Sequence, residues 1–389
     1  MKQFYLLLCC FAILEIGFAQ NSLQKPVIKV DIPTPTADKP QSKIWFMDST
    51  WWALLPSKSG PTLWERTADG WITNAEVNNQ LKGLQGRVDT YVDRNIVYAV
   101  GVNNYEISVF SLSKSSSRWK VNVLGNFTFK KNKHVETATI SLDNVGNLWV
   151  SAIVGDEVTV WCKSGNKHWN KPYIIANGIG KDDICTIVTQ DNLVRVIWSD
   201  QKNEAIMNCT HLNTKTYNEW ESIEIVEKGN KTADDHLNTL VADDGTLYLV
   251  TKNSLDIVGK PQFVLRVLPV GGTWKNYPFC NLEATRQPTR PIIVGVKNKA
   301  SDIFIGYSMF DDKEDNTGQI LFAVMDLNSE TVVAKTISVM NPDKQVWGKG
   351  NQINNVTGPK DLFAASTPWI VLASDKEGNV YEADLSIFF

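Results

Sequence analysis

A strand, turn and strand unit recurs along this chain at intervals of roughly 50 residues, and no other sequence feature restricts the fold as strongly. Its clearest copies are ETATISLDNVGNLWVSAIV from Glu136, DDICTIVTQDNLVRVIWSD from Asp182 and DDHLNTLVADDGTLYLVTK from Asp234. Each copy has a polar start, a short apolar strand, a turn of Asp, Asn or Gly, and a second apolar strand. This length is typical of one blade of a β-propeller.

Weaker copies begin at Ser42, Gly86, Thr289 and Thr357, which brings the number of units to seven. Further short strands that end near a tryptophan lie between the hairpins, as in TLWERTADGWITN and HLNTKTYNEWESI. Two inner and two outer strands per unit are what a four-stranded blade requires. The sequence therefore predicts an all-β, seven-bladed β-propeller, and a sandwich, whose strands would not recur in regular fours, fits less well.

The two ends of the chain carry strand patterns that would close such a ring. An open ring would leave unpaired strand edges, which proteins avoid. The C-terminal GNVYEADLSIFF supplies a third strand of the last blade, and PVIKVDI near the N-terminus supplies its outermost strand. We expect closure by strands from both termini.

The N-terminus is predicted to be a secretory signal peptide. Lys2 is followed by an apolar run from Phe4 to Phe18, and Ala19 provides a small residue for cleavage. We expect a signal peptide over residues 1–19, an extended proline-rich segment over 20–42 and the propeller over 43–389. No later stretch is long enough to span a membrane. The sequence thus predicts a secreted or periplasmic protein, which we expect to be monomeric.

Composition excludes some functions and leaves others open. A formal charge of -3 over 389 residues indicates no bulk affinity for nucleic acid or for an acidic membrane surface. Fourteen tryptophans and ten tyrosines suit both propeller cores and sugar-binding surfaces, and the structural use is the more common. Beyond the signal peptide, four cysteines at wide spacings match no zinc pattern, and both disulfides and buried free thiols remain open. They are Cys162, Cys185, Cys209 and Cys280.

Charged residues precede the first strand of most units, and in a propeller these positions meet at one mouth of the central channel. They are Arg87 and Asp89, His134 and Glu136, Asp182 and Asp183, Asp234 to His236, Thr289 and Arg290, and Asn354, Asn355 and Lys360. The sequence predicts that they form one polar floor. The alternative is that an aspartate before a strand merely caps a turn through its own backbone.

Several short motifs, in this order, carry a family resemblance. They are WW-x-LLP from Trp51, GR-x-D from Gly86, D-x-x-G-x-LW from Asp143, DDI followed by WSDQ, DDH-x-N from Asp234, TRP from Thr289, and NNVT with Lys360. The chain resembles exported bacterial seven-bladed β-propellers of the largely uncharacterised, sialidase-like (BNR) type. It is more distantly similar to propeller polysaccharide lyases of ulvan-type degradation, which use His, Tyr and Arg at the same mouth. With four histidines in all, the chain departs from those lyases.

The first functional hypothesis is β-elimination on a uronate-containing oligo- or polysaccharide, by a lyase or dehydratase. Removing the proton α to a carboxylate needs a base and a group that neutralises the carboxylate. Arg290 is the preferred carboxylate partner because its guanidinium matches a carboxylate bidentately, with Arg87 and Lys360 as secondary choices. His236 is the expected base, oriented by Asp235 or Asp234, and His134 is the reserve. Further expected substrate contacts are Asp89, Asp182, Asp234, Asn238, Gln201, Lys252 and Asn355.

Two other functions stay open. Glycoside hydrolysis by an aspartate pair would place the chemistry on Asp183 and Asp235. A non-catalytic glycan-binding propeller would need no such pair, because propellers host both enzymes and binding proteins. No cofactor is expected, although the clustered aspartates would suit a structural Ca²⁺.

Overall fold

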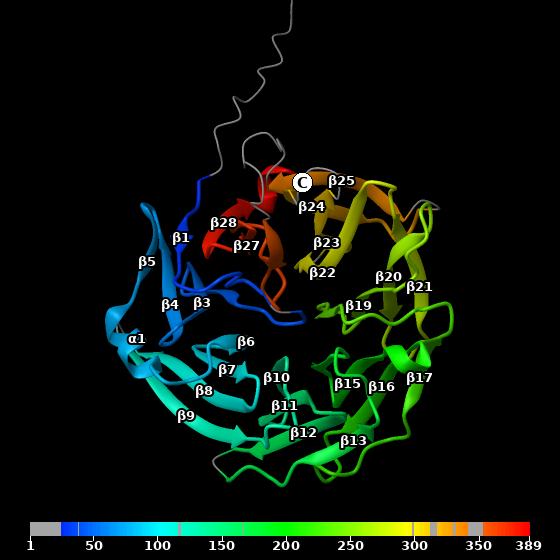
Figure 1. Cartoon of the computed structure of the whole chain (residues 1–389). Coiled ribbons are helices and arrows are strands. Elements are labelled where there is room, and N and C mark those ends of the chain that lie inside the picture. The colour runs from blue at the N-terminus through cyan, green and yellow to red at the C-terminus, as the bar shows by residue number, and fades with distance from the viewer. Residues whose placement is uncertain are drawn as a thin grey trace, which may run out of the picture.

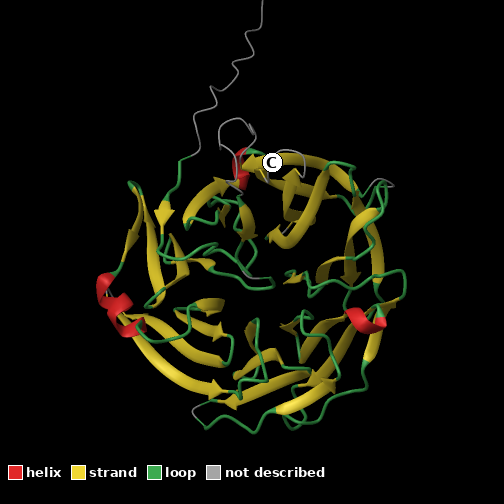
Figure 2. Cartoon of the chain, viewed as in Figure 1, coloured by secondary structure: helices red, strands yellow, loops and turns green. Residues whose placement is uncertain are grey.

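The computed structural model describes residues 25–389 apart from 38, 116–117, 166, 298, 312–316, 330–331 and 341–352. The expected signal peptide lies outside this range. Seven four-stranded antiparallel sheets stand around a central axis like blades (Figure 1), and strands dominate the ring throughout (Figure 2). The predicted all-β, seven-bladed β-propeller is confirmed.

The first four blades follow the chain in order, each running from an inner strand at the channel to an outer strand at the rim. Blade 1 contains β2 (Ile44–Met47), β3 (Thr50–Ser57), β4 (Gly60–Thr67) and β5 (Gly70–Thr73); blade 2 contains β6 (Arg87–Asp93), β7 (Ile96–Asn103), β8 (Glu106–Ser115) and β9 (Arg118–Thr128). Blade 3 contains β10 (Ala138–Leu142), β11 (Asn147–Val154), β12 (Glu157–Ser164) and β13 (Tyr173–Asn177); blade 4 contains β14 (Cys185–Gln190), β15 (Leu193–Asp200), β16 (Ala205–Leu212) and β17 (Glu224–Lys228).

The remaining blades continue the ring and close it. Blade 5 contains β18 (Leu237–Val241), β19 (Leu247–Lys252), β20 (Pro261–Leu268) and β21 (Lys275–Asn281); blade 6 contains β22 (Arg286–Val296), β23 (Lys299–Asp311), β24 (Thr317–Met325) and β25 (Val333–Met340). Blade 7 contains β26 (Asn354–Thr357), β27 (Ile370–Ser374), β28 (Asn379–Asp384) and, outermost, the N-terminal β1 (Ile28–Lys29). The short helices are α1 (Ala75–Leu81), η1 (Gln201–Asn203) and η3 (Leu385–Ile387).

Closure of the ring by both termini is confirmed. Ile28 of β1 pairs with Val380 of β28, so the first described strand completes the last blade. The edge that β28 would otherwise leave open is thereby paired. Among the described residues, no helix is both long and apolar enough to cross a membrane.

Two predicted strand positions in the last blades were wrong. The seventh unit was expected to start its inner strand at Thr357, but β26 ends there. The following segment instead joins blade 6, where Phe363 exchanges backbone hydrogen bonds of 2.8 Å with Gly295 and Lys297. In blade 6 the inner strand was expected after Arg290, yet β22 starts at Arg286, and a bulge follows Thr289.

Aromatic side chains pack mainly between blades. Nine tryptophans of the described part of the chain are buried, which supports the structural use of the aromatic load. Trp52 of blade 1 meets Trp119 of blade 2 edge-on at 4.9 Å between ring centroids, and Phe263 of blade 5 meets Tyr307 of blade 6 at 5.2 Å. Each such pair contributes about 0.5–1.5 kcal/mol beyond the area it buries. The four cysteines left open by the sequence are free thiols.

The D-x-x-G-x-LW motif is a turn clamp. The Asp143 carboxylate accepts hydrogen bonds from the backbone N–H of Asn147 at 2.7 Å and from Trp149 Nε1 at 2.8 Å. In blade 7 the Asp375 carboxylate does the same with the Asn379 amide at 3.0 Å and the Tyr381 hydroxyl at 3.0 Å. Hydrogen bonds to a charged group contribute about 1.5–3 kcal/mol, so each clamp fixes its hairpin.

Candidate functional site

The proline-rich segment lies across the mouth at which the inner strands begin. We call residues 34–37 and 39–43 the strap; it leaves β1, crosses the centre of the ring and enters β2 (Figure 1). Thr36 Oγ1 lies 2.6 Å from Ser374 Oγ of blade 7, and Gln41 Nε2 donates to Ala138 O of blade 3 at 3.0 Å. Lys43, which is fully buried, donates to Val88 O of blade 2 at 2.8 Å. The strap therefore ties distant blades together at the channel.

The Asp–His cluster, defined as Asp234, Asp235 and His236 with Lys39 and Lys252, lies beneath the strap at the start of β18. His236 Nδ1 contacts the Asp234 carboxylate and lies 2.5 Å from Asp235 Oδ1. Lys252 Nζ donates to Asp234 Oδ2 at 2.7 Å, and Lys39 of the strap forms an ion pair with Asp235. The structure thus brings together four residues that the sequence analysis named, and adds Lys39.

The charges of this cluster are satisfied internally. Burial raises the pKa of Asp235, but the hydrogen bond and charge of His236, with Lys39, outweigh it and hold that pKa below its usual range. His236 is only 7% exposed, and its Nε2 atom lies 3.4 Å from Thr289 Oγ1. With both ring nitrogens facing protein groups, His236 is poorly placed to take a proton from a substrate.

The same cluster offers the donor set for a metal ion. One ligand atom each from Asp234, Asp235 and His236 can be chosen so that all lie within 4.8 Å of one another. Ca²⁺ prefers six to eight oxygen ligands, whereas here the ammonium groups of Lys39 and Lys252 already neutralise the two carboxylates. A structural Ca²⁺ stays a prediction, and a bound ion would have to displace these lysines.

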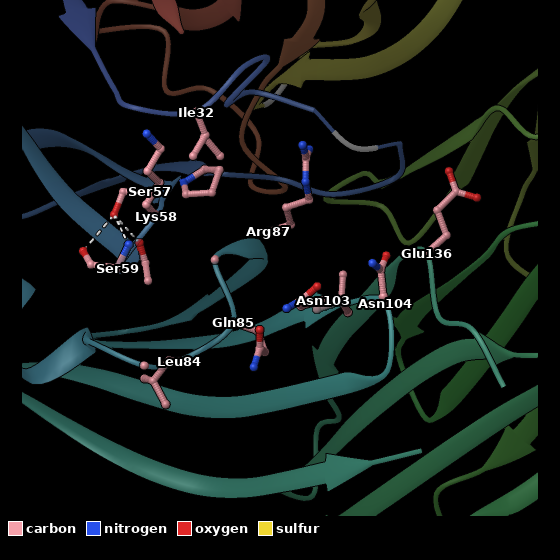
Figure 3. A pocket seen from close by; sticks show the side chains of 15 residues that line it. Ile32, Ser57, Lys58, Ser59, Leu84, Gln85, Arg87, Asn103, Asn104 and Glu136 are labelled. Atoms are coloured by element: carbon pink, nitrogen blue, oxygen red, sulfur yellow. Dashed lines mark hydrogen bonds between the residues drawn. The ribbon is translucent and has the colours of Figure 1, made fainter. Parts of the chain in front are cut away.

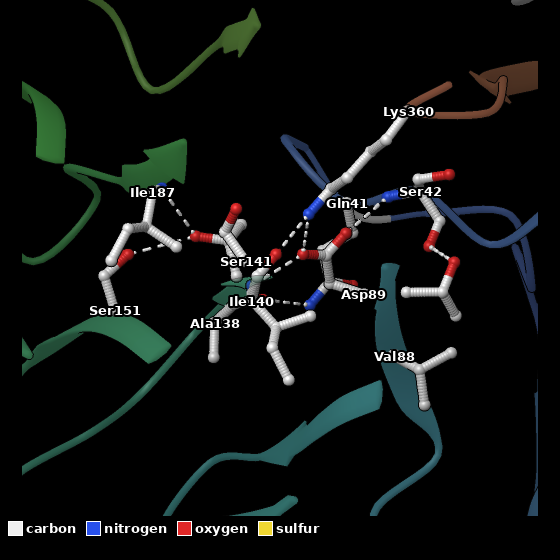
Figure 4. A network of polar contacts seen from close by, with 12 residues as sticks. Gln41, Ser42, Val88, Asp89, Ala138, Ile140, Ser141, Ser151, Ile187 and Lys360 are labelled. Carbon is white, nitrogen blue, oxygen red and sulfur yellow. Dashed lines mark hydrogen bonds and ion pairs between the residues drawn. The ribbon is translucent and has the colours of Figure 1, made fainter. Parts of the chain in front are cut away.

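A second ion pair joins Asp89 of β6, which is fully buried, to Lys360, whose side chain is 23% exposed (Figure 4). The Asp89 carboxylate also accepts the Ser42 and Ile140 amides, each at 2.8 Å, and Lys360 Nζ donates to Ile140 O at 2.8 Å. Burial raises the pKa of Asp89, while Lys360 and these hydrogen bonds oppose the rise. Asp89 and Lys360, both expected to bind substrate, are therefore committed to holding the strap and blades 2, 3 and 7.

Lys360 also lines a cavity of about 230 Å³. Its walls include Tyr91, Thr189 and Thr239 from three inner strands, with Asp361 beside Lys360. The surrounding protein raises the pKa of Asp361, opposed by Lys297 and Lys360. Sequence reasoning missed Asp361 because the seventh inner strand was placed too late. The signal available was its position directly after Lys360.

A third region, the rim pocket, is open. This cavity of about 440 Å³ lies between blades 1 and 2 beside the mouth (Figure 3). Its wall carries polar side chains from β3, the turn after it, the segment before β6, the end of β7 and the segment before β10. These side chains are Ser57, Lys58, Ser59, Gln85, Arg87, Asn103, Asn104 and Glu136. Arg87 and Glu136 are two of the residues that the sequence analysis placed at the mouth.

His134 lies at the edge of this pocket, whereas Arg290 belongs to another part of the mouth. His134 is exposed, and its Nε2 atom is 3.2 Å from Asn104 Oδ1. Arg290 lies within the bulge of β22 with a φ of 54°, and its guanidinium carbon is 5.7 Å from the centre of the Phe310 ring. The reserve base His134 and the preferred carboxylate partner Arg290 are thus divided between two places.

The other predicted contacts are mostly structural in their bonding. Asp183 Oδ2 accepts a hydrogen bond from the backbone N–H of Gly180 at 2.9 Å. Its Oδ1 accepts hydrogen bonds from Ser199 Oγ at 3.0 Å and from the backbone N–H of Gln201 at 3.1 Å. This is the turn-capping alternative, and it leaves Asp183 poorly suited to hydrolysis. Asp182 is exposed on the same loop, Asn238 Oδ1 accepts the Ile293 amide at 3.2 Å, and the Asn355 amide donates to Ser308 Oγ at 3.1 Å.

Comparisons with known proteins do not assign the chain to a family. No family model matches the chain, and no curated protein matches it. A Penicillium chrysogenum α-L-arabinanase complexed with arabinobiose is similar at 9% identity and a TM-score of 0.46, over 77% of this chain and 98% of the arabinanase. A mutant NanB sialidase from Streptococcus pneumoniae is similar at 14% identity and a TM-score of 0.37, over 78% and 51% of the two chains. A cobalt-substituted Synechocystis apocarotenoid oxygenase (ACO) is similar at 8% identity and a TM-score of 0.46, over 81% and 76%. Similarities this remote do not bear on activity.

Proposed function

We propose that the protein is an exported carbohydrate-binding propeller that holds an acidic oligosaccharide in the rim pocket. The observation that carries this proposal is the composition of the pocket wall, in which Arg87 stands among amide and hydroxyl side chains around about 440 Å³. This volume lies in the range of about 300–1,000 Å³ that small-molecule sites occupy. Amides and hydroxyls match the hydroxyl groups of a sugar, and a guanidinium matches a carboxylate bidentately.

The charge of the wall favours a uronate over a neutral sugar. Lys58 and Arg87 contribute two positive charges, and Glu136 contributes one negative charge. In the Asp–His cluster the strap covers the charged groups, and His236 is only 7% exposed. Binding at the rim pocket therefore has better support than catalysis at His236.

β-Elimination at the rim pocket is the second candidate, and the position of His134 favours it. His134 is exposed, and its Nε2 atom lies 3.2 Å from Asn104 Oδ1 of the pocket wall. It would accept the C5 proton of a uronate, and the C5–H electron pair would form the C4–C5 double bond while Arg87 neutralises the carboxylate. The C4 oxygen would leave with the electron pair of the broken C4–O bond and take a proton from water.

The test is calorimetric titration of the purified protein with uronate-containing oligosaccharides and with their methyl esters. Arg87→Gln removes the charged fork, and losing hydrogen bonds to a charged group lowers affinity about tenfold to a hundredfold. The matched control is Arg94→Gln, at the other end of β6, where the arginine side chain is 90% exposed. Equal affinity for acids and esters, or an Arg87→Gln variant that binds like Arg94→Gln, would contradict the proposal.

The same samples separate binding from elimination. Ultraviolet absorbance of a new double bond that vanishes in His134→Ala would establish elimination with His134 as base. Binding with neither new absorbance nor new reducing ends would establish a lectin. New reducing ends without absorbance would indicate hydrolysis and contradict both candidates.

A further inference from the structure

A larger cavity lies away from the channel, between blades 5 and 6. This inter-blade pocket has a volume of about 680 Å³ and is lined by β21 on one side and by β23, β24 and β25 on the other. It shares no lining residue with the rim pocket. Its wall divides into a polar end, at Arg286 and Glu283, and an apolar side that includes Phe279, Leu321 and Val333.

The polar end contains a buried donor that lacks an acceptor. Arg286 Nη2 donates to Gln319 Oε1 at 3.0 Å, and its Nη1 lies 3.5 Å from Glu283 Oε1. Its Nε atom is buried and has no hydrogen-bond partner within the described part of the chain. Buried donors are nearly always paired, so an acceptor from outside the protein would complete this guanidinium. The Glu283 side chain is 49% exposed, and such surface ion pairs are weak and easily opened.

Two further groups on the wall are neutral at physiological pH. Burial raises the pKa of the Cys280 thiol to about 11 and raises that of the Tyr307 hydroxyl well above its usual range. Cys280 has a φ of 57° at the irregular end of β21, an unusual conformation for a residue other than glycine. Neither group adds a negative charge that would repel an anion bound to Arg286.

The geometry points to a ligand with an anionic head and an apolar body. We propose that the inter-blade pocket binds a small amphipathic carboxylate, its head on Arg286 and its chain against Leu321 and Val333. A carboxylate presents two acceptor oxygens to the fork of a guanidinium, and burying the methylenes of its chain against apolar side chains is favourable. This site is independent of the carbohydrate proposed for the rim pocket.

Octanoate, with octanol as its uncharged counterpart, tests the proposal by calorimetric titration of the whole protein. We expect octanoate to bind more tightly than octanol. Arg286→Gln should lower octanoate affinity at least about tenfold and leave octanol affinity unchanged. Arg94→Gln is the matched control and should bind octanoate like the parent protein.

A second variant keeps the arginine and fills the apolar side. Val333→Phe, at a half-buried position on β25, should weaken octanoate and octanol alike while circular dichroism and thermal melting show an intact fold. No octanoate binding by the parent protein would overturn the proposal. So would full octanoate affinity in either Arg286→Gln or Val333→Phe. Because the rim pocket is untouched by these variants, uronate titration of the same samples tests the proposed function separately.

Discussion

The Asp–His cluster and the rim pocket contain similar residue types but differ in their access to solvent. In the cluster, His236 and two lysines face two carboxylates, and the strap covers them. In the rim pocket, Arg87, Lys58 and Glu136 line an open cavity together with amides and hydroxyls. The difference teaches that charge at the start of an inner strand does not identify a binding site. The path of the N-terminal segment decides which charges are sealed and which face solvent.

The largest expected effect on stability concerns the ion pair between Asp89 and Lys360 in the channel. Lys360→Met would leave Asp89 buried without its cation, and breaking a buried ion pair costs about 3–5 kcal/mol. We expect a loss of that size in the free energy of urea-induced unfolding. Asp89→Asn combined with Lys360→Met should recover part of it, because neither charge then remains. If Lys360→Met alone has the same free energy of unfolding as the parent protein, the ion pair with Asp89 does not stabilise the fold.

The next largest effect concerns the Asp–His cluster, whose contribution to the free energy of unfolding should depend on pH at acid values. The pKa of Asp235 is lower in the folded protein than its usual value of about 3.9, so the ionised group stabilises the fold above that value. This contribution is lost as the pH falls below about 4. Asp235→Asn should therefore flatten the decline of unfolding free energy between about pH 4 and pH 2. The exposed Asp182→Asn is the matched control and should keep the parent slope.

A smaller effect is expected where the strap meets the cluster. Lys39→Met removes the partner of Asp235 at a contact that is 13% exposed on the lysine side and 26% on the aspartate side. Partly exposed ion pairs contribute up to about 1 kcal/mol, and their strength falls with salt. The unfolding curves of the parent protein and the variant should differ at low salt and converge at high salt. A salt-independent difference would argue against an ionic contact.

The smallest effect on stability is expected for a substitution in the wall of the rim pocket. Asn103 is exposed in the pocket wall, and surface substitutions away from buried contacts change stability by about 0.5 kcal/mol or less. Asn103→Ala should melt like the parent protein while weakening uronate binding. A marked drop in melting temperature would show that the rim pocket is part of the structural framework.

The repeat period was enough to predict the ring and its closure, because blade length and strand alternation are local properties of the sequence. The positions of Asp361 and Arg290 were harder to predict. Both lie in irregular backbone: Asp361 is in the segment that leaves β26 for blade 6, and Arg290 is within the bulge of β22. The pairing of Lys39 with Asp235 joins residues 196 positions apart, and no local pattern reports such a contact.

The pairing of β1 with β28 has a consequence for how the molecule is made. Ile28 leaves the ribosome long before Val380 does, so blade 7 cannot be completed until synthesis is almost finished. Until then β28 lacks its neighbour, and an unpaired strand edge recruits other chains. Such long-range pairing also slows folding. Deleting residues 25–29, which include β1, should thus increase self-association during refolding.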